Sequence, residues 1–319
     1  MKTTSFKALR AYAWAVVVYL IGVILFGAWV RITHSGAGCG EHWPTCHGQI
    51  VPLEPTIETM IEYTHRLTSG LCGIFAIVLL GWSWRVSGWS RITRGALVVL
   101  ALTIFEGAIG AGLVLGELVN NDDSVARAVV ISLHLVNTLV LMAAASLTAW
   151  WAGGRPGFSI RKPSPLRLWL LACIGLVILT AMTGAVTALG DTLFPVDPTL
   201  GGGLLGRISD DLTSANHFLV RLRIVHPIIA VLTAAAVFVM SSVVRYQSVD
   251  DLTRRLSTIL AVVVGIQTVL GVSNIALQAP GWMQLLHLAT AQVLWIFLVL
   301  VFAHVQADSD TGRAGGVAL

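Results

Sequence analysis

The chain has 319 residues, of which 56% are hydrophobic and only 11% are charged, and its mean hydropathy is +0.82. This composition is typical of integral membrane proteins and excludes an ordinary water-soluble domain. The formal net charge is only +4, and the basic residues form no concentrated patch that would indicate a nucleic-acid partner.

Eight apolar stretches are long enough to cross a bilayer as helices. In chain order they cover residues 11–30, 61–82, 95–115, 128–151, 168–189, 222–244, 258–277 and 283–305. No small-residue cleavage site follows the first stretch, so we expect a retained helix and not a removed signal peptide. The sequence therefore predicts an all-α integral membrane protein with eight transmembrane helices.

Lysine and arginine residues gather in the loops on one side of these spans. They are Lys2, Lys7 and Arg10, then Arg85, Arg91 and Arg94, then Arg155, Arg161, Lys162 and Arg167, then Arg245, Arg254 and Arg255. The positive-inside rule makes this side cytoplasmic. We expect a multi-pass protein of the cell (plasma) membrane with both termini in the cytoplasm.

Two cysteines lie in the loop after the first span, on the predicted outer side. Six residues separate Cys39 from Cys46, in a compartment that permits disulfides. Two interpretations stay open: a structural disulfide, or a redox-active pair that relays electrons to a nearby site. Cys72 and Cys173 lie within predicted helices and are expected to act as small apolar side chains.

The second span begins with the sequence Glu62-Tyr-Thr-His65-Arg66. Glu62 and His65 are three residues apart, so they share one face of the helix. A carboxylate beside a metal-binding histidine can tune the metal or move protons, which makes Glu62 a candidate catalytic residue. The alternative is an interfacial carboxylate that pairs with Arg66.

The third span carries Glu106 near its middle, the deepest carboxylate in the sequence. A proton relay is one interpretation of this residue. Hydrogen-bonded helix packing is the other, and it is favoured because the matching residue in the second half of the chain is the neutral Gln267.

The second half of the chain repeats the first. Residues 104–111 resemble residues 265–272, and the same offset relates the second and sixth spans. Because four spans preserve orientation, this is a parallel repeat of two pseudo-symmetric four-helix bundles. We expect halves at 1–152 and 168–319, joined by a cytoplasmic linker at 153–167. The matched positions pair Glu106 with Gln267, Gly110 with Gly271, His65 with His226, and His134 with His287.

Each even-numbered span carries one histidine near its outer end: His65, His134, His226 and His287. An ionisable side chain inside a membrane helix is costly and usually marks a functional site. Two histidines that face each other across a four-helix bundle can hold one heme iron from both sides. The sequence therefore predicts one heme site in each half, with hydrogen-bonded packing histidines as the alternative. We expect the remaining histidines to be solvated: His34, His42, His47, His217 and His304.

The two histidine neighbourhoods differ. In the second half the motif reads Arg223-Ile-Val-His226-Pro227, so an arginine replaces the glutamate and a proline replaces the arginine. Arg223 would suit a heme propionate, through a charge-assisted hydrogen bond. Pro227 should bend its helix locally. We interpret the second half as a fixed cofactor site and the first half as the place where chemistry occurs.

These features together resemble the heme A synthase family: the Glu62-x-x-His65-Arg66 motif, paired outer cysteines, eight helices in two repeats and four helix-borne histidines. The resemblance covers nearly the whole chain. It implies a membrane oxidoreductase that converts the C8 methyl group of heme O to a formyl group, giving heme A for terminal oxidases. Heme O, membrane lipid, an electron carrier and the heme O synthase (protoheme farnesyltransferase) are the partners that this pathway suggests.

The resemblance also assigns roles to residues. It implies that His226 and His287 hold the iron of a resident heme b, that His65 and His134 ligate the substrate heme, that Glu62 is the catalytic carboxylate, and that Cys39 and Cys46 form the outer-loop pair. The second half lacks the cysteine pair that some members of the family carry there.

Two other classes of protein fit part of the pattern. A diheme electron-transfer cytochrome of b type would explain the histidines but leave Glu62 without a role. A transporter built from repeats would bind no heme. The pigment of the purified protein distinguishes the three, whereas the source of the oxygen atom stays open.

Overall fold

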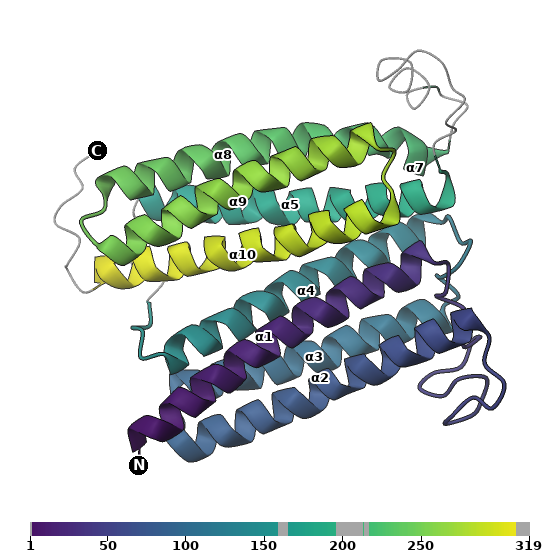
Figure 1. The fold of residues 1–319 in the computed structure, drawn as a ribbon, viewed down its shortest axis with the longest axis horizontal. Helices are drawn as coiled ribbons and strands as arrows, with labels where there is room; N and C mark the ends of the chain where they lie inside the picture. Colours follow the sequence, from purple (N-terminus) through teal and green to yellow (C-terminus); the bar gives the residue numbers. More distant parts are fainter. Residues whose placement is uncertain (1, 159–164, 196–212, 214–216, 311–319) are drawn as a thin grey trace.

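A computed structural model describes residues 2–158, 165–195, 213 and 217–310 (Figure 1). Eight helices are long and apolar enough to cross a membrane, which confirms the predicted all-α membrane class. Arg161 and Lys162 of the predicted linker lie outside the described residues. The helices are α1 (Lys2–Ile32), α2 (Ile57–Ser87), α3 (Arg91–Leu115), α4 (Val125–Ala152), α5 (Pro165–Leu193), α8 (Val225–Gln247), α9 (Asp251–Ala276) and α10 (Gly281–Asp310).

Most helices extend beyond the apolar stretches because polar residues cap them. Thr56 and Ser124 accept hydrogen bonds from backbone amides in the first turns of α2 and α4. The sixth span begins differently, with the short helix α7 (Phe218–Arg221) and the 3-10 turn η1 (Leu222–Ile224) ahead of α8. Pro227 has no amide hydrogen to donate to the carbonyl four residues earlier, so a regular helix is interrupted at the predicted place.

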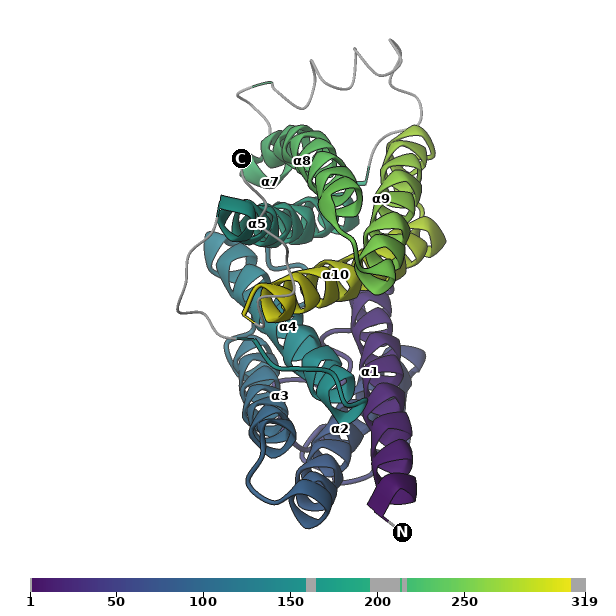
Figure 2. The ribbon, with the colours of Figure 1, turned by 90° about the vertical axis from the view of Figure 1, so that its left-hand side faces the viewer.

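The helices form two closed rings. In the first ring α1 packs against α2 and α4, and α3 packs against the same two helices. In the second ring α5 and α9 both pack against α8 and α10. Figure 1 and Figure 2 show the rings side by side, with α4 of one next to α5 and α10 of the other. The contacts thus group the helices as the sequence repeat predicts.

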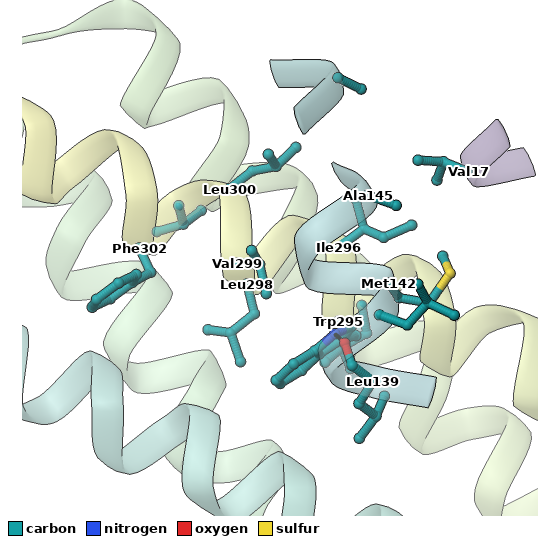
Figure 3. Close-up of a cluster of buried hydrophobic side chains, with 14 of the residues drawn as sticks. Val17, Leu139, Met142, Ala145, Trp295, Ile296, Leu298, Val299, Leu300 and Phe302 are labelled. Carbon is teal, nitrogen blue, oxygen red and sulfur yellow. Dashed lines mark hydrogen bonds between the residues drawn. The ribbon is translucent and has the colours of Figure 1, made fainter. Parts of the chain in front are cut away.

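A continuous apolar core joins the two rings, and its centre is the contact between α4 and α10 (Figure 3). Met142 and Leu298 are fully buried there. Trp295 on α10 is also buried, and its indole nitrogen donates to the carbonyl oxygen of Leu139 on α4 at 2.7 Å. Packing and one directional bond therefore hold the rings together near their middle.

Arg31, near the end of α1, links the rings at the end of the molecule that carries the disulfide loop. Its guanidinium donates to the carbonyl of Ala188 and the hydroxyl of Thr192 on α5, and to Gln284 on α10 at 2.9 Å. A buried guanidinium requires several acceptors, and these residues supply them.

The outward faces of the helices are apolar and uncovered. Ile77 on α2, Val231 on α8 and Val269 on α9 are 59%, 61% and 65% exposed. Side chains of this kind on successive turns would be costly in water but are favourable against lipid. The chain is therefore a multi-pass membrane protein.

One expectation about the histidines is wrong. His304 was expected to be solvated, but it is only 6% exposed, and its Nε2 lies 3.0 Å from a carboxylate oxygen of Asp250, the residue that caps α9. Burial alone would raise the pKa of Asp250, but hydrogen bonds from Thr253 and His304 outweigh burial and lower it. This contact could not be predicted from the sequence because the two residues are 54 positions apart.

We predict that Trp295→Phe loses the hydrogen bond to Leu139 and leaves a small cavity where the larger indole was packed. The expected loss is about 1–3 kcal/mol of unfolding free energy, the sum of the lost bond and the cavity. Denaturant titration in detergent micelles measures it. Trp84→Phe on the exposed face of α2 is the control and should be neutral; equal destabilisation by both variants would contradict the assignment.

Candidate functional site

A continuous cavity of about 2790 Å³ opens between the helices and includes all four predicted histidines in its lining. Pockets for one small-molecule ligand usually measure roughly 300–1,000 Å³. The volume is therefore several times what one such ligand requires. Both rings contribute to the wall, so the cavity can take one large ligand in each.

The four histidines line the cavity in the predicted pairs. His65 on α2 and His134 on α4 line it from the first ring, and His226 on α8 and His287 on α10 line it from the second. In each ring the two helices of a pair both pack against the same two neighbours, so they face each other across the ring. This is the arrangement that a bis-histidine heme site requires.

Glycines on the neighbouring helices provide room for three of these imidazole side chains. A Cβ atom added at Gly27 would lie 3.1 Å from His65, at Gly184 2.9 Å from His226, and at Gly271 3.3 Å from His287. Gly271 could be matched with Gly110 from the sequence, but Gly27 and Gly184 were not predicted. A repeat match between the first and fifth spans would have identified them, since both glycines face the equivalent histidine.

The donor set fits a heme. Among the described residues, no group of three or more His, Cys, Asp or Glu side chains is positioned to hold a bare metal ion. A heme needs only two axial ligands from the protein, because the porphyrin supplies the other four. The two imidazoles that line the cavity from each ring supply that number.

The third helix of each ring, α3 or α9, carries one polar residue near its middle, and each of these residues contacts a histidine. Glu106 accepts hydrogen bonds from Asn137 and Thr138 of α4, and one of its oxygens lies 3.4 Å from Nδ1 of His134. That distance allows an ion-pair contact, although the alignment is not that of a hydrogen bond. Gln267, the repeat partner of Glu106, lies 3.1 Å from Nε2 of His287. Packing through hydrogen bonds, the favoured interpretation of Glu106, is therefore present.

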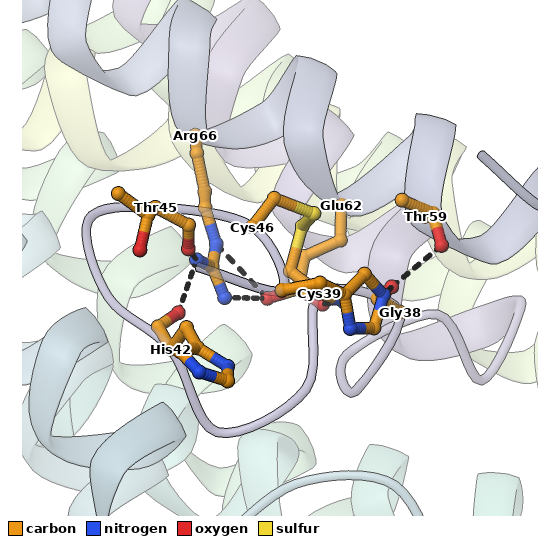
Figure 4. A network of polar contacts seen from close by, with 9 residues as sticks. Gly38, Cys39, His42, Thr45, Cys46, Thr59, Glu62 and Arg66 are labelled. Carbon is orange, nitrogen blue, oxygen red and sulfur yellow. Dashed lines mark hydrogen bonds and ion pairs between the residues drawn. A yellow bond between two sulfur atoms is a disulfide. The ribbon is translucent and has the colours of Figure 1, made fainter. Parts of the chain in front are cut away.

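Glu62 lies at the centre of a polar network at the outer end of α2 (Figure 4). It is only 4% exposed, and it accepts a hydrogen bond from the backbone amide of Cys39 at 2.8 Å. Arg66 donates to it at 3.0 Å through Nε and also bonds the carbonyls of His42 and Thr45. The predicted alternative, a carboxylate paired with Arg66, is thus present, and Glu62 also lines the cavity.

The outer-loop cysteines are joined, since Cys39 and Cys46 form a disulfide. Through the amide of Cys39 and the carbonyl of Thr45, this loop is attached directly to Glu62 and Arg66. The other two cysteines, Cys72 and Cys173, are free and buried within helices as expected.

Arginines from both rings line the cavity: Arg31, Arg66 and Arg127 in the first ring and Arg223 in the second. Arg223 is held by Asp191 at 3.0 Å and donates to the carbonyl of Gly190 at 2.8 Å. Arg127 on α4 donates to the carbonyls of Asn120 and Asp122, and its buried Nε has no hydrogen-bond partner among the described residues. Arg223 was predicted from the sequence, but Arg127 was not. The second half of the chain has no matching arginine that would have drawn attention to it.

We predict that Gly184→Ala displaces His226, because the new Cβ would lie 2.9 Å from its ring. The heme content of the purified protein should fall several-fold. Gly175→Ala on the same helix is the matched control, because a Cβ there meets nothing within 4 Å. Equal heme content in the two variants would show that the glycine does not shape the site.

Comparisons with known proteins agree with this geometry. Residues 10–299 match the family COX15-CtaA, described as cytochrome oxidase assembly protein. A Thermus thermophilus protein named protoheme IX farnesyltransferase is 43% identical over 302 residues, 94% of this chain and 49% of that protein. The chain thus spans about half the length of that curated relative.

Shorter matches have a different name. Proteins named heme A synthase from Halalkalibacterium halodurans and Shouchella clausii are 40% and 44% identical over 109 and 102 residues. These matches cover 34% and 31% of this chain, and 37% and 34% of the two proteins. Because the family match extends over nearly the whole chain, the protein belongs to the COX15-CtaA family of cytochrome oxidase assembly proteins.

Proposed function

We propose that the protein is a heme A synthase, a membrane oxidoreductase that converts the C8 methyl group of heme O to a formyl group. The main support is the placement of two histidine pairs from facing helices in one large cavity, with the carboxylate Glu62 beside only one pair. The family match and the names of the shorter relatives favour heme A biosynthesis over other diheme chemistry.

The second ring is the proposed site of a resident heme b. His226 and His287 would ligate its iron, and Arg223 would lie near a propionate. Arg223 already has a partner in Asp191, so its role is to keep a positive charge at a fixed position at the outer end of the cavity. When bound, heme b supplies one-electron transfer.

The first ring is the proposed substrate site, with His65 and His134 as ligands of heme O. Arg127 lies seven residues before His134 on α4 and lines the same cavity, so it is the propionate partner in this ring. The two rings then use arginines from different helices for the same task.

Conversion of a methyl group to a formyl group removes four electrons and releases protons that must leave an apolar cavity. Glu62 is the carboxylate beside His65 that lines this cavity and also contacts the outer loop. It can accept a proton at one oxygen while Arg66 and the amide of Cys39 keep the side chain in place. Protons can then pass toward the outer surface, which is only a few residues away.

The orientation follows from charge. Helix α1 begins and α10 ends at the same end of the molecule, opposite the disulfide loop (Figure 1). We propose that this end, with the basic loops, is cytoplasmic. The disulfide and Glu62 then face the outer compartment of the cell membrane, where disulfides form.

We also propose a partnership with a heme O synthase. The Thermus thermophilus protein named protoheme IX farnesyltransferase is about twice as long as the region that matches this chain. The farnesyltransferase activity would reside in its unmatched half, so that the enzyme making heme O and the enzyme consuming it are joined in one polypeptide. A non-covalent contact would serve the same transfer here.

Pigment analysis tests the proposed function. We predict that the full-length protein, expressed together with a heme O synthase, carries heme b and also heme O or heme A, and that heme A accumulates in membranes. Extraction of the hemes and chromatography measures this. Heme b alone in both sites, even with heme O supplied, would instead identify a diheme electron-transfer cytochrome, and a colourless protein would favour a transporter.

We predict that Glu62→Gln retains heme b and heme O but stops heme A formation. The amide keeps the size of the side chain and one acceptor oxygen, so it retains the hydrogen bond from either Arg66 or the amide of Cys39 but not both, while proton acceptance is lost. Glu58→Gln, one turn earlier and exposed on the same helix, is the matched control. Unchanged heme A output from the Glu62 variant would remove this residue from the mechanism.

A further inference from the structure

In each of the four histidines, an iron would bond one imidazole nitrogen and leave the other free. The four side chains differ in which neighbouring group contacts that free nitrogen. In the second ring, Nδ1 of His226 lies 3.1 Å from the carbonyl of Thr180 and 3.3 Å from the hydroxyl of Thr183, both on α5. A metal-ligating histidine usually donates its other nitrogen in this way, which fixes the ring. Across the ring, Gln267 contacts Nε2 of His287, and Nδ1 of that residue has no hydrogen-bond partner among the described residues.

In the first ring the histidine with a polar neighbour is on the other helix. Nδ1 of His134 forms no hydrogen bond among the described residues, but it lies 3.4 Å from Glu106, an ion-pair distance, and the oxygens of Glu106 are themselves fixed by Asn137 and Thr138. His65, the repeat partner of the held His226, has a buried Nδ1 without a hydrogen-bond partner in the described ranges.

Helix α1 shows why the imidazole of His65 lacks such a partner. Gly27 and Gly184 face equivalent histidines, so the positions of Thr180 and Thr183 on α5 correspond to Val23 and Phe26 on α1. The hydroxyl that contacts His226 is thus replaced by an aromatic ring, which meets His65 edge to face at 5.6 Å. This contact has no acceptor oxygen that would fix the imidazole.

The charged neighbours of the two histidines also differ. Arg66 follows His65 on α2 and is bonded to Glu62. In the first ring α4 therefore carries His134 with Arg127, whereas α2 carries His65 with this ion pair.

We propose that α4 anchors the substrate heme through His134, positioned by Glu106, and that His65 is an exchangeable ligand that leaves the iron during the reaction. This rests on the proposed function and adds a role for Glu106 as a positioning residue. In the exchange the bond between Nε2 of His65 and the iron breaks, its electron pair returns to the imidazole, and the vacated position opens beside Glu62. No electron leaves the iron in this step.

Carbon monoxide is a suitable probe, because it binds ferrous heme only where an axial position is free or is easily vacated. Full-length protein is loaded with heme O, reduced under anaerobic conditions and titrated with the gas. We expect one of the two hemes to bind it in the native protein. His65→Ala should retain the first-ring heme and bind the gas with higher affinity, whereas His134→Ala should lose that heme.

Glu106→Gln separates positioning from ligation. We expect it to weaken heme O binding in the first ring about tenfold, the effect typical of losing the partner of a metal-ligating histidine, with heme b in the second ring unchanged. Glu117→Gln, at an exposed carboxylate just past the end of α3, is the matched control and should leave the binding of both hemes unchanged.

The outcomes separate this inference from the proposed function. A protein that binds heme O but loses it equally in the His65 and His134 variants, or is unaffected by Glu106→Gln, overturns the inference and leaves the synthase intact. A protein with no heme in the first ring overturns both. Retention of heme b reports correct folding, and if His134→Ala fails that check, the result from Glu106→Gln decides.

Discussion

An imidazole inside a membrane has two nitrogen atoms, and each requires a partner because no bulk water is available. A heme iron can satisfy only one of them. The other is held only where a neighbouring residue offers an acceptor, and this determines how firmly the ligand is fixed. Much of the site can be understood from this constraint, including the glycines that admit the rings and the different partners of His134 and His226.

Sequence reasoning was strongest where one residue type had a single physical explanation. Apolar length predicted the eight spans, and the repeat singled out four histidines that line one cavity. It was weaker for contacts between distant segments. Neither Asn137 nor Thr138 has a feature that would reveal its bond to Glu106, and Arg127 has no repeat partner to draw attention to it. Such contacts depend on helix rotation, which hydropathy does not specify.

The buried His304 illustrates a related reason for error. Its position near the end of α10 suggested exposure to solvent. However, Asp250, which lies directly before α9 and caps that helix, contacts this imidazole. A residue at the end of one helix is exposed only if no neighbouring element covers it. Coverage is a property of tertiary packing, so sequence position alone was insufficient.

The bonds of Arg31 have a consequence for electron exchange between the two hemes of the proposed function. Arg31 ties α1 to α5 and α10, near the end of the molecule where both histidine pairs lie. The rate of electron tunnelling falls steeply with the distance between donor and acceptor, so sliding of one ring past the other would change it greatly. By bonding to two helices of the opposite ring, one guanidinium keeps that gap constant while the lipid around the protein moves.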